Sequence, residues 1–228
     1  MAKAILTDIE GTTTPIDFVH KTLFPFARDR MAVYVRDNFS SLTAEIAQLS
    51  AEIDDDGGFD PNDPSSVSDH LCRLIDLDRK STPLKSIQGN IWETGYTSGE
   101  LLSEIYDDVP AAFERWHASG KTIAIYSSGS VLAQQLLFRH TRFGDLTGYI
   151  NGYFDTKTGA KRETASYQRI ADLLRYEPAD IVFLSDIPAE LDAAAAAGVS
   201  TILTIRPGNA EVGEDVSHVR VNDFTGLE

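Results

Sequence analysis

Short apolar runs alternate with amphipathic helical patterns through much of this 228-residue chain, and this alternation restricts the fold more than any other feature. The runs lie at residues 4–7, 123–126, 181–184 and 201–205, and they are rich in β-branched residues. Helical patterns cover residues 109–117, 166–175 and 189–197. Alternating strands and helices predict an α/β fold, with a parallel, doubly wound, Rossmann-like sheet that helices cover on both faces.

Residues 15–106 interrupt this alternation. The segment is too long for one crossover connection, and most of it shows helical patterns. We therefore expect a core formed by residues 1–14 and 107–228, with a helical cap inserted after the first strand. The Asp-rich loop at 54–66 lacks the Glu that closes a calcium-binding EF loop, which favours a solvated loop over a calcium site.

The charge balance limits the partners of the chain. A formal net charge of −15 argues against nucleic acid and anionic membranes, because both are bound mainly by cationic surfaces. The one cysteine, Cys72, cannot form an internal disulfide and suits a reducing compartment. No leader is expected before the first strand. These features predict a cytoplasmic protein that is a monomer.

Polar residues follow the predicted strands at the point where each one ends. Asp8 and Asp186 follow two of them, Ser127 and Ser128 follow a third, and Lys161 precedes a predicted helix. Because parallel strands end at one rim, these side chains should lie together. Like charges so grouped need a cation, and Mg²⁺ prefers carboxylate and phosphate oxygens. The hydroxyls and the lysine would bind the other phosphate oxygens.

Two acids near the N-terminus suggest a reaction. Asp8 can act as a carboxylate nucleophile that forms an acyl-phosphate. Glu10 can protonate the leaving oxygen and then activate water. The spacing predicts a phosphohydrolase.

Each of the other residues also has a simpler interpretation. Asp186 could be no more than a helix N-cap, and Ser127 and Ser128 could be ordinary turn residues. Lys161 could be a solvated surface residue. Glu190 is either a first-turn helix charge or a support for the metal ligands. The order of these residues at strand ends favours the functional interpretation of the set.

The motif at residues 8–12, Asp-x-Glu-Gly-Thr, resembles that of the haloacid-dehalogenase superfamily, in which the second acid is usually Asp. The longer form at residues 8–14, with Glu10 and three threonines, resembles one branch, the bifunctional enolase-phosphatases of methionine salvage. Five further segments resemble the same family: PIDFVHKTLFPFA, GYTSGELLSEIYDDVPAAFERW, IYSSGSVLAQQLLF, GDLTGYINGYFDTKTGAKRETASY and FLSDIPAELDAAAAAG.

This resemblance implies a monomeric enzyme with one Mg²⁺ per chain. Its substrate would be 2,3-diketo-5-methylthiopentyl-1-phosphate, which is enolised and then dephosphorylated to the acireductone 1,2-dihydroxy-3-keto-5-methylthiopentene. The implied metal ligands are Asp8, Glu10 through its main-chain carbonyl, and Asp186. The implied substrate contacts are Ser127, Ser128 and Lys161.

Other hypotheses remain open at this point. A plain magnesium phosphatase would carry the same phosphoryl-transfer motifs, whereas a dehalogenase would not need Glu10 and Asp186. A phospho-receiver signalling domain is about half this length and has no place for a cap. A catalytically silent binding protein would not need the full set of motif residues. In the cap, Phe18, Trp92 and Tyr96 are candidates both for gripping the methylthio group and for packing.

Overall fold

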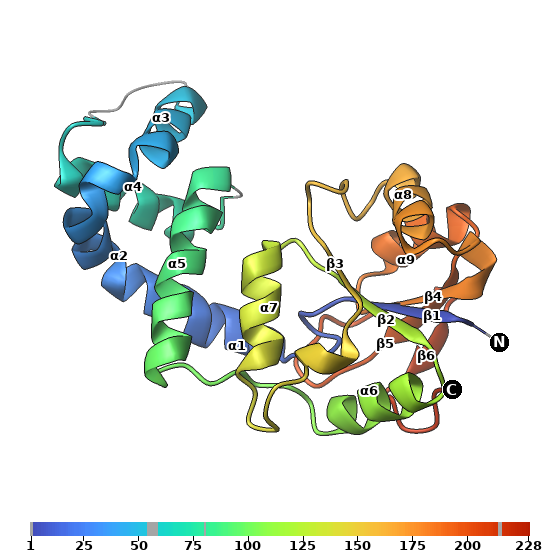
Figure 1. Ribbon diagram of the computed structural model, residues 1–228. Helices are drawn as coiled ribbons and strands as arrows, with labels where there is room; N and C mark the ends of the chain where they lie inside the picture. The colour runs from blue at the N-terminus through green and yellow to red at the C-terminus, as the bar shows by residue number, and fades with distance from the viewer. Residues whose placement is uncertain (1, 54–58, 80, 214–215) are drawn as a thin grey trace. The chain divides into compact units, whose positions relative to one another are not determined.

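The computed structural model describes residues 2–53, 59–79, 81–213 and 216–228. The chain divides into two compact units (Figure 1): Met1–Phe18 with Leu102–Glu228, and Val19–Leu101. The boundaries expected from the sequence, after residues 14 and 106, lie a few residues away from these divisions. The first part of the Asp-rich loop, residues 54–58, lies outside the described residues.

The first unit contains a six-stranded, wholly parallel sheet with the strand order β3-β2-β1-β4-β5-β6 (Figure 1). The strands are β1 (Ala4–Thr7), β2 (Thr122–Tyr126), β3 (Gly152–Phe154), β4 (Ile181–Ser185), β5 (Ser200–Thr204) and β6 (Val219–Val221). The α/β fold and the four predicted strands are confirmed. The sequence analysis missed β3 and β6, which have only three residues each.

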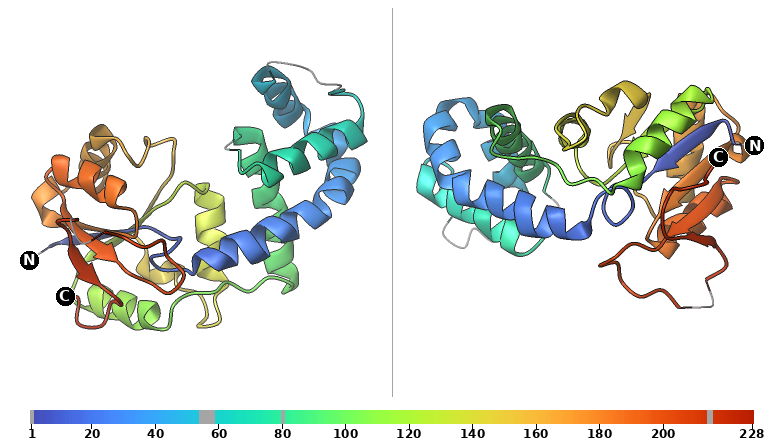
Figure 2. Two further views of the ribbon diagram at one scale, coloured as in Figure 1. Left: turned by 180° about the vertical axis from the view of Figure 1, so that it is seen from behind. Right: turned by 90° about the horizontal axis from the view of Figure 1, so that it is seen from below.

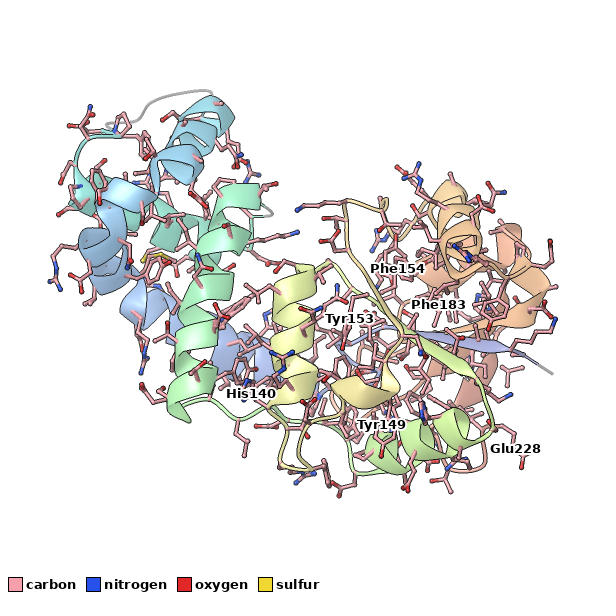
Figure 3. The ribbon with its side chains drawn as sticks, viewed as in Figure 1. His140, Tyr149, Tyr153, Phe154, Phe183 and Glu228 are labelled. Atoms are coloured by element: carbon pink, nitrogen blue, oxygen red, sulfur yellow. The ribbon has the colours of Figure 1, made fainter. Side chains whose placement is uncertain are left out.

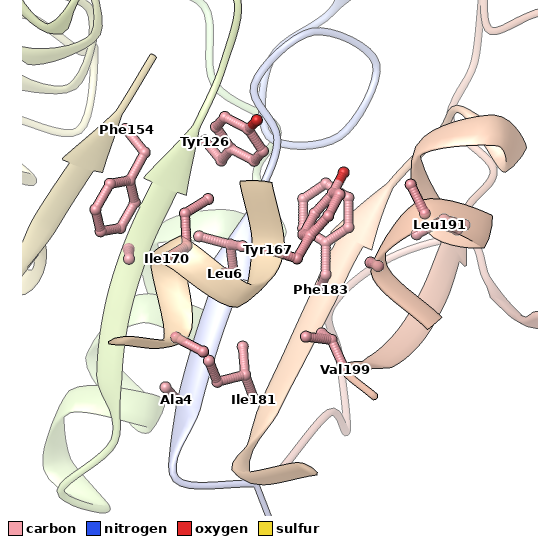
Figure 4. Close-up of a cluster of buried hydrophobic side chains, with 14 of the residues drawn as sticks. Ala4, Leu6, Tyr126, Phe154, Tyr167, Ile170, Ile181, Phe183, Leu191 and Val199 are labelled. Carbon is pink, nitrogen blue, oxygen red and sulfur yellow. The ribbon is translucent and has the colours of Figure 1, made fainter. Parts of the chain in front are cut away.

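Helices cover both faces of this sheet (Figures 1 and 2). They are α6 (Asp108–Ala118), α7 (Val131–Arg139), α8 (Thr164–Leu174) and α9 (Pro188–Ala196). Because side chains alternate along a strand, Leu6 of β1 faces α8 and α9 whereas its neighbour Ile5 faces the opposite side. On the α8 side, Phe154 and Phe183 belong to one buried core (Figures 3 and 4).

All regular elements described in the second unit are helices. It contains η1 (Val19–Leu23), α2 (Phe24–Asn38), η2 (Phe39–Ser41), α3 (Thr43–Glu52), α4 (Pro64–Asp76) and α5 (Thr82–Ser98), while the short α1 (Ile16–Phe18) ends the first segment of the sheet unit. Asp63 caps α4 and Ser81 caps α5 through side-chain bonds to main-chain N–H groups. None of the helices described is long and apolar enough to cross a membrane.

The aromatic residues considered for substrate contact are buried. In the helical unit, Trp92 donates its Nε1–H to the carbonyl of Leu23 at 2.8 Å and stacks on Phe24, and Tyr96 is buried nearby on the same helix. Phe18 is also buried. These contacts favour the packing interpretation for Trp92.

Candidate active site

The predicted acids end neighbouring strands at the centre of the sheet. Asp8 follows β1 and Asp186 follows β4, and Thr7 at the end of β1 is paired with Leu184 of β4. On its other side, Thr7 is paired with Ile125 of β2, the strand that Ser127 follows. The order of the strands reverses between β1 and β4, and parallel sheets bind their ligands at the carboxyl ends of the strands at such a point.

The loop after β1 is a tight turn organised around one carbonyl. The main-chain N–H groups of residues 12–14 all donate to the carbonyl of Ile9, at 3.1, 2.9 and 2.9 Å. The N–H of Ile9 donates to Asp8 Oδ1 at 2.7 Å, which fixes the rotation of that carboxylate. Gly11 adopts a φ of +66°, a backbone conformation that favours glycine. The turn therefore explains why a glycine follows the two acids.

Lys161 joins two acids in the site. Its Nζ lies 2.7 Å from Asp8 Oδ2 and 2.6 Å from Glu190 Oε2, and Ser185 Oγ donates to the same glutamate oxygen at 3.1 Å. Burial alone would lower the pKa of Lys161, but the charges of Asp8 and Glu190 outweigh it and raise that pKa. The Lys161 side chain is only 10% exposed and is paired with two carboxylates, so the solvated-surface interpretation is wrong. Glu190 lies in the first turn of α9 and also contacts the Lys161 ammonium.

Asp186 is a third buried acid in the site, beside Asp8 and Glu190. The N-cap of α9 is Ile187, and no side chain makes a capping bond there, so the helix-cap interpretation of Asp186 is wrong. Burial, and then the charge of Asp8, raise the pKa of Asp186 to about 7. A Cβ on Gly11 would lie only 2.4 Å from Asp186 Oδ2, so the missing side chain leaves the space that this carboxylate occupies.

The residues present fit a hard divalent cation. Within the described ranges, no three His, Cys, Asp or Glu side chains are grouped as a complete metal site. Mg²⁺ does not require one, because it commonly binds one or two carboxylates and completes its shell with water and phosphate oxygens. Asp8 and Asp186 are both buried, the charge of Asp8 disfavours the charge of Asp186, and a cation removes that cost.

The serine pair lies in the loop between β2 and α7. The N–H of Ser127 donates to the carbonyl of Phe154 at 3.1 Å, and its Oγ accepts from the N–H of Gly129 at 3.2 Å. Ser128 is half-buried beside it. The sequence analysis missed Gln134, whose Nε2 donates to the carbonyls of Gly129 and Phe154 at 2.9 and 2.8 Å. Gln134 thereby ties this loop to the end of β3.

Two further residues that the sequence analysis missed hold the Asp8 loop. Arg206 Nε donates to the carbonyl of Thr12 at 3.1 Å, and Asn209 Nδ2 donates to the carbonyl of Gly11 at 2.9 Å. The guanidinium of Arg206 also forms a bidentate pair with Asp108 at 2.9 and 2.8 Å. Both lie just after β5, in the segment RPGN. Bonds from side chains to a distant main chain leave no periodic signal in a sequence.

The chain is similar to enolase-phosphatases over nearly its whole length. An enolase-phosphatase E1 of Synechococcus elongatus is 53% identical over 218 residues, which cover 91% of this chain and 90% of that protein. An enolase-phosphatase E1 of Drosophila yakuba is 42% identical over 241 residues, which cover all of this chain and 93% of that protein. Among solved structures, the UTR4 protein of Saccharomyces cerevisiae superposes with a TM-score of 0.84 at 36% identity, with both chains covered completely.

The family to which these relatives point is also found by a family model. Residues 2–198 match the model of the haloacid dehalogenase-like hydrolases. A crystal structure titled CbbY from Rhodobacter sphaeroides in complex with phosphate has a TM-score of 0.59 at 16% identity, which supports the fold alone. The chain therefore belongs to the haloacid dehalogenase-like hydrolases and, within them, to the family of the enolase-phosphatases E1.

Proposed function

We propose that this enzyme is a Mg²⁺-dependent enolase-phosphatase of methionine salvage. Its substrate is 2,3-diketo-5-methylthiopentyl-1-phosphate, and its products are the acireductone 1,2-dihydroxy-3-keto-5-methylthiopentene and phosphate. The observation that carries the proposal is the buried arrangement of Asp8, Lys161 and Glu190 at the rim, with Asp186 after the adjacent strand. The similarity to enolase-phosphatases over nearly the whole chain supports the choice of substrate.

The cofactor we propose is one Mg²⁺ per chain. It would be held by the carboxylates of Asp8 and Asp186 and by the main-chain carbonyl of Glu10. When bound, it supplies Lewis-acid polarisation of substrate oxygens and neutralises charge on the phosphoryl group.

The first half of phosphoryl transfer depends on Asp8. Its carboxylate attacks phosphorus, so that an Asp8–phosphorus bond forms while the bond to the ester oxygen breaks. Glu10 gives its proton to the departing oxygen. The ammonium of Lys161, 2.7 Å from Asp8 Oδ2, orients the carboxylate and would attract the phosphate oxygens. Ser127 and Ser128, which end β2 beside the Asp8 strand, are the proposed hydroxyl contacts to the phosphate.

The second half regenerates the enzyme. Glu10, now deprotonated, takes a proton from water as the water oxygen attacks phosphorus. The bond between phosphorus and Asp8 breaks, which releases phosphate and restores the carboxylate. The preceding enolisation moves a proton from carbon to a carbonyl oxygen of the diketone and leaves the composition of the substrate unchanged.

We propose that the inserted helical segment, residues 15–106, serves as a cap that excludes water from the reaction. The enzyme would act as a cytoplasmic monomer, without nucleic acid or membrane partners. A size-exclusion measurement with light scattering checks the monomer: the expected mass is that of one 25.0 kDa chain.

The function is tested by adding the diketone phosphate with and without Mg²⁺. Phosphate release and the ultraviolet absorbance of the acireductone should both rise with the wild-type enzyme and Mg²⁺. In Asp8→Asn, phosphate release should fall by at least about a thousandfold, because covalent catalysis requires the carboxylate. Circular dichroism of the variant controls for folding.

Two results would contradict parts of the proposal. If generic phosphate esters are cleaved while the diketone phosphate is not, the enzyme is a phosphatase of another substrate. If Asp8→Asn retains full phosphate release, the proposed nucleophile is wrong. Exchange of the carbon-bound proton with deuterated solvent in Asp8→Asn would show enolisation separately from hydrolysis.

A further inference from the structure

Three hydroxyl groups bind three consecutive carbonyls of the segment that carries Lys161. Tyr126 Oη donates to the carbonyl of Gly159 at 2.9 Å. Ser166 Oγ donates to the carbonyl of Ala160 at 2.8 Å. Tyr167 Oη donates to the carbonyl of Lys161 itself at 2.6 Å. We call these donors the hydroxyl triad.

The triad lies on a strand and a helix, whereas the Lys161 segment that it binds lies in a loop. Tyr126 is the last residue of β2, and Ser166 and Tyr167 belong to the first turn of α8. The Lys161 segment lies between β3 and α8 and forms neither helix nor strand. This segment has isolated turn bonds, such as that from the Glu163 N–H to the Ala160 carbonyl at 3.0 Å, in place of a helical or sheet ladder. Even so, the Lys161 ammonium must stay within 2.7 Å of two carboxylate oxygens.

The core holds the triad in place independently of its hydroxyls. The rings of Tyr126 and Tyr167 meet edge to face at 5.6 Å, and Tyr167 also contacts Phe183 at 5.2 Å (Figure 4). All three triad residues are buried. Removal of a tyrosine hydroxyl leaves these ring contacts intact, so the hydrogen bond can be tested separately from the packing.

The fit between the triad and the segment is close. A Cβ on Gly159 would lie 2.1 Å from Ser166 Oγ, which means that the glycine allows the main chain to approach the serine. The ammonium of Lys161 also lies 5.9 Å from the ring centroid of Tyr126. Tyr126 thus contacts the lysine segment both through its hydroxyl and through its ring.

We propose that Tyr126, Ser166 and Tyr167 are positioning residues, which hold the Lys161 ammonium between Asp8 and Glu190 through the main chain of the segment. The inference rests on the proposed function, in which Lys161 aligns the nucleophile and the phosphate. A loosened segment would lower kcat more than it changes KM, because the alignment matters most in the transition state.

The first arm of the test compares hydroxyl deletions. Tyr167→Phe should lower kcat for phosphate release by about tenfold, because the loosened segment aligns the Lys161 ammonium less well in the transition state. Ser166→Ala and Tyr126→Phe should act in the same direction. The matched control is Tyr176→Phe, which removes a hydroxyl bond of 2.9 Å to Thr122 at the opposite end of β2. The control should keep the wild-type kcat, and equal losses in Tyr176→Phe and Tyr167→Phe would overturn the proposal.

The second arm asks whether the effect passes through the lysine. In a Lys161→Met background, the residual phosphate release should be the same with and without Tyr167→Phe. A full tenfold effect of Tyr167→Phe in that background would show that the tyrosine acts by another route and would overturn the proposal.

The third arm needs no substrate. Reductive methylation with formaldehyde and a borane reductant, read by mass spectrometry, reports how exposed each lysine amine is. Methylation of Lys161 should be several-fold faster in Tyr167→Phe than in the wild type, while the other lysines should react equally in both. Unchanged methylation of Lys161 would overturn the proposal. Failure of the wild type to act on the diketone phosphate would count against the proposed function only, because this arm is independent of turnover.

Discussion

Gly11 meets two conditions in the loop that carries Asp8, the proposed nucleophile. Its φ of +66° closes the turn, and the space where a side chain would lie is filled by Asp186, with Asn209 on the same side. The first condition is common to many turns, whereas the second is particular to this site. A substitution can separate them, because other glycines in the chain share the angle without the crowding.

We predict that Gly11→Ala destabilises the enzyme and abolishes most of its activity. The left-handed angle costs about 1 kcal/mol with any other residue. The new Cβ, 2.4 Å from Asp186 Oδ2, additionally forces that carboxylate to move. We expect kcat to fall by a hundredfold or so if Asp186 carries the proposed ligand role. Urea denaturation and phosphate release measure the two effects.

Gly120→Ala is the matched control for this prediction. Gly120 has a φ of +76° in the same unit, and nothing lies within 4 Å of the position of its Cβ. It should lose about 1 kcal/mol of stability and keep its activity. If both variants lose activity equally, the close approach of residue 11 to Asp186 does not contribute to catalysis.

At the scale of elements, one ion pair joins three segments of the sheet unit. Arg206 lies just after β5, Asp108 begins α6, and the N–H of Phe224 near the C-terminus donates to Asp108 Oδ2 at 2.7 Å. The guanidinium also lies over the rings of Tyr106 and Phe224, at 4.4 and 4.6 Å. The Arg206 side chain is 3% exposed and that of Asp108 is 16% exposed, so water screens this pair only weakly.

We predict that Arg206→Met lowers the free energy of unfolding by about 3 kcal/mol or more, since it leaves the Asp108 carboxylate buried without its counter-charge. Arg36→Met is the control, because the Arg36–Asp37 pair is exposed and should contribute nothing measurable. Urea denaturation of the two variants at pH 7 compares them. Similar stabilities would mean that the Arg206 pair contributes no more than a surface pair.

The Arg206–Asp108 pair should also make the free energy of unfolding depend on pH. Burial alone would raise the pKa of Asp108, but the hydrogen bonds from Arg206 and from the Phe224 main chain outweigh it, so that pKa is lowered. A lowered folded-state pKa means that the stabilisation is complete above the unfolded value of about 3.9 and is lost as the pH falls below it. Asp108→Asn should therefore be less stable at pH 7, with a shallower loss of stability below about pH 4. An identical acid dependence in both proteins would exclude Asp108 as a source of it.

What the sequence reveals at this scale depends on length and polarity. The four strands with four or five residues could be predicted because they are apolar and bounded by turn residues. β3 and β6 could not, because three residues show no periodicity and both strands lie at the edges of the sheet, where they are partly exposed. Asp8, Lys161 and Asp186 were found because their positions after strands or before a helix are visible in the sequence. Gln134, Arg206 and Asn209 act on distant carbonyls, which only the fold brings near.

At the scale of the whole molecule, each unit has its own tryptophan. Trp92 lies in the helical unit and Trp116 in the sheet unit, where its Nε1 donates to the carbonyl of Leu227 at 2.9 Å. Each unit also has its own buried apolar residues, such as Met31 and Leu71 in one and Phe113 and Phe183 in the other.

We predict that the two units unfold at different urea concentrations. Trp116→Phe leaves Trp92 to report on the helical unit, and Trp92→Phe leaves Trp116 to report on the sheet unit. Separate cores should give fluorescence midpoints that do not coincide. Circular dichroism of both variants corrects for any change in stability from the substitution itself. Coincident midpoints would mean that the chain unfolds as one cooperative unit.

The pairing of β1 also has a consequence for synthesis on the ribosome. Ala4 is translated more than a hundred residues before its partners in the neighbouring strands, Thr122 and Ile181. The helical unit, by contrast, is one continuous segment that is finished long before β4 emerges. The strand that carries Asp8 therefore has no partner in the sheet until β2 has been translated, and Asp8 has no lysine partner until Lys161 has followed. Chaperones should meet this chain as a nascent protein with its central strand exposed and one helical unit already formed.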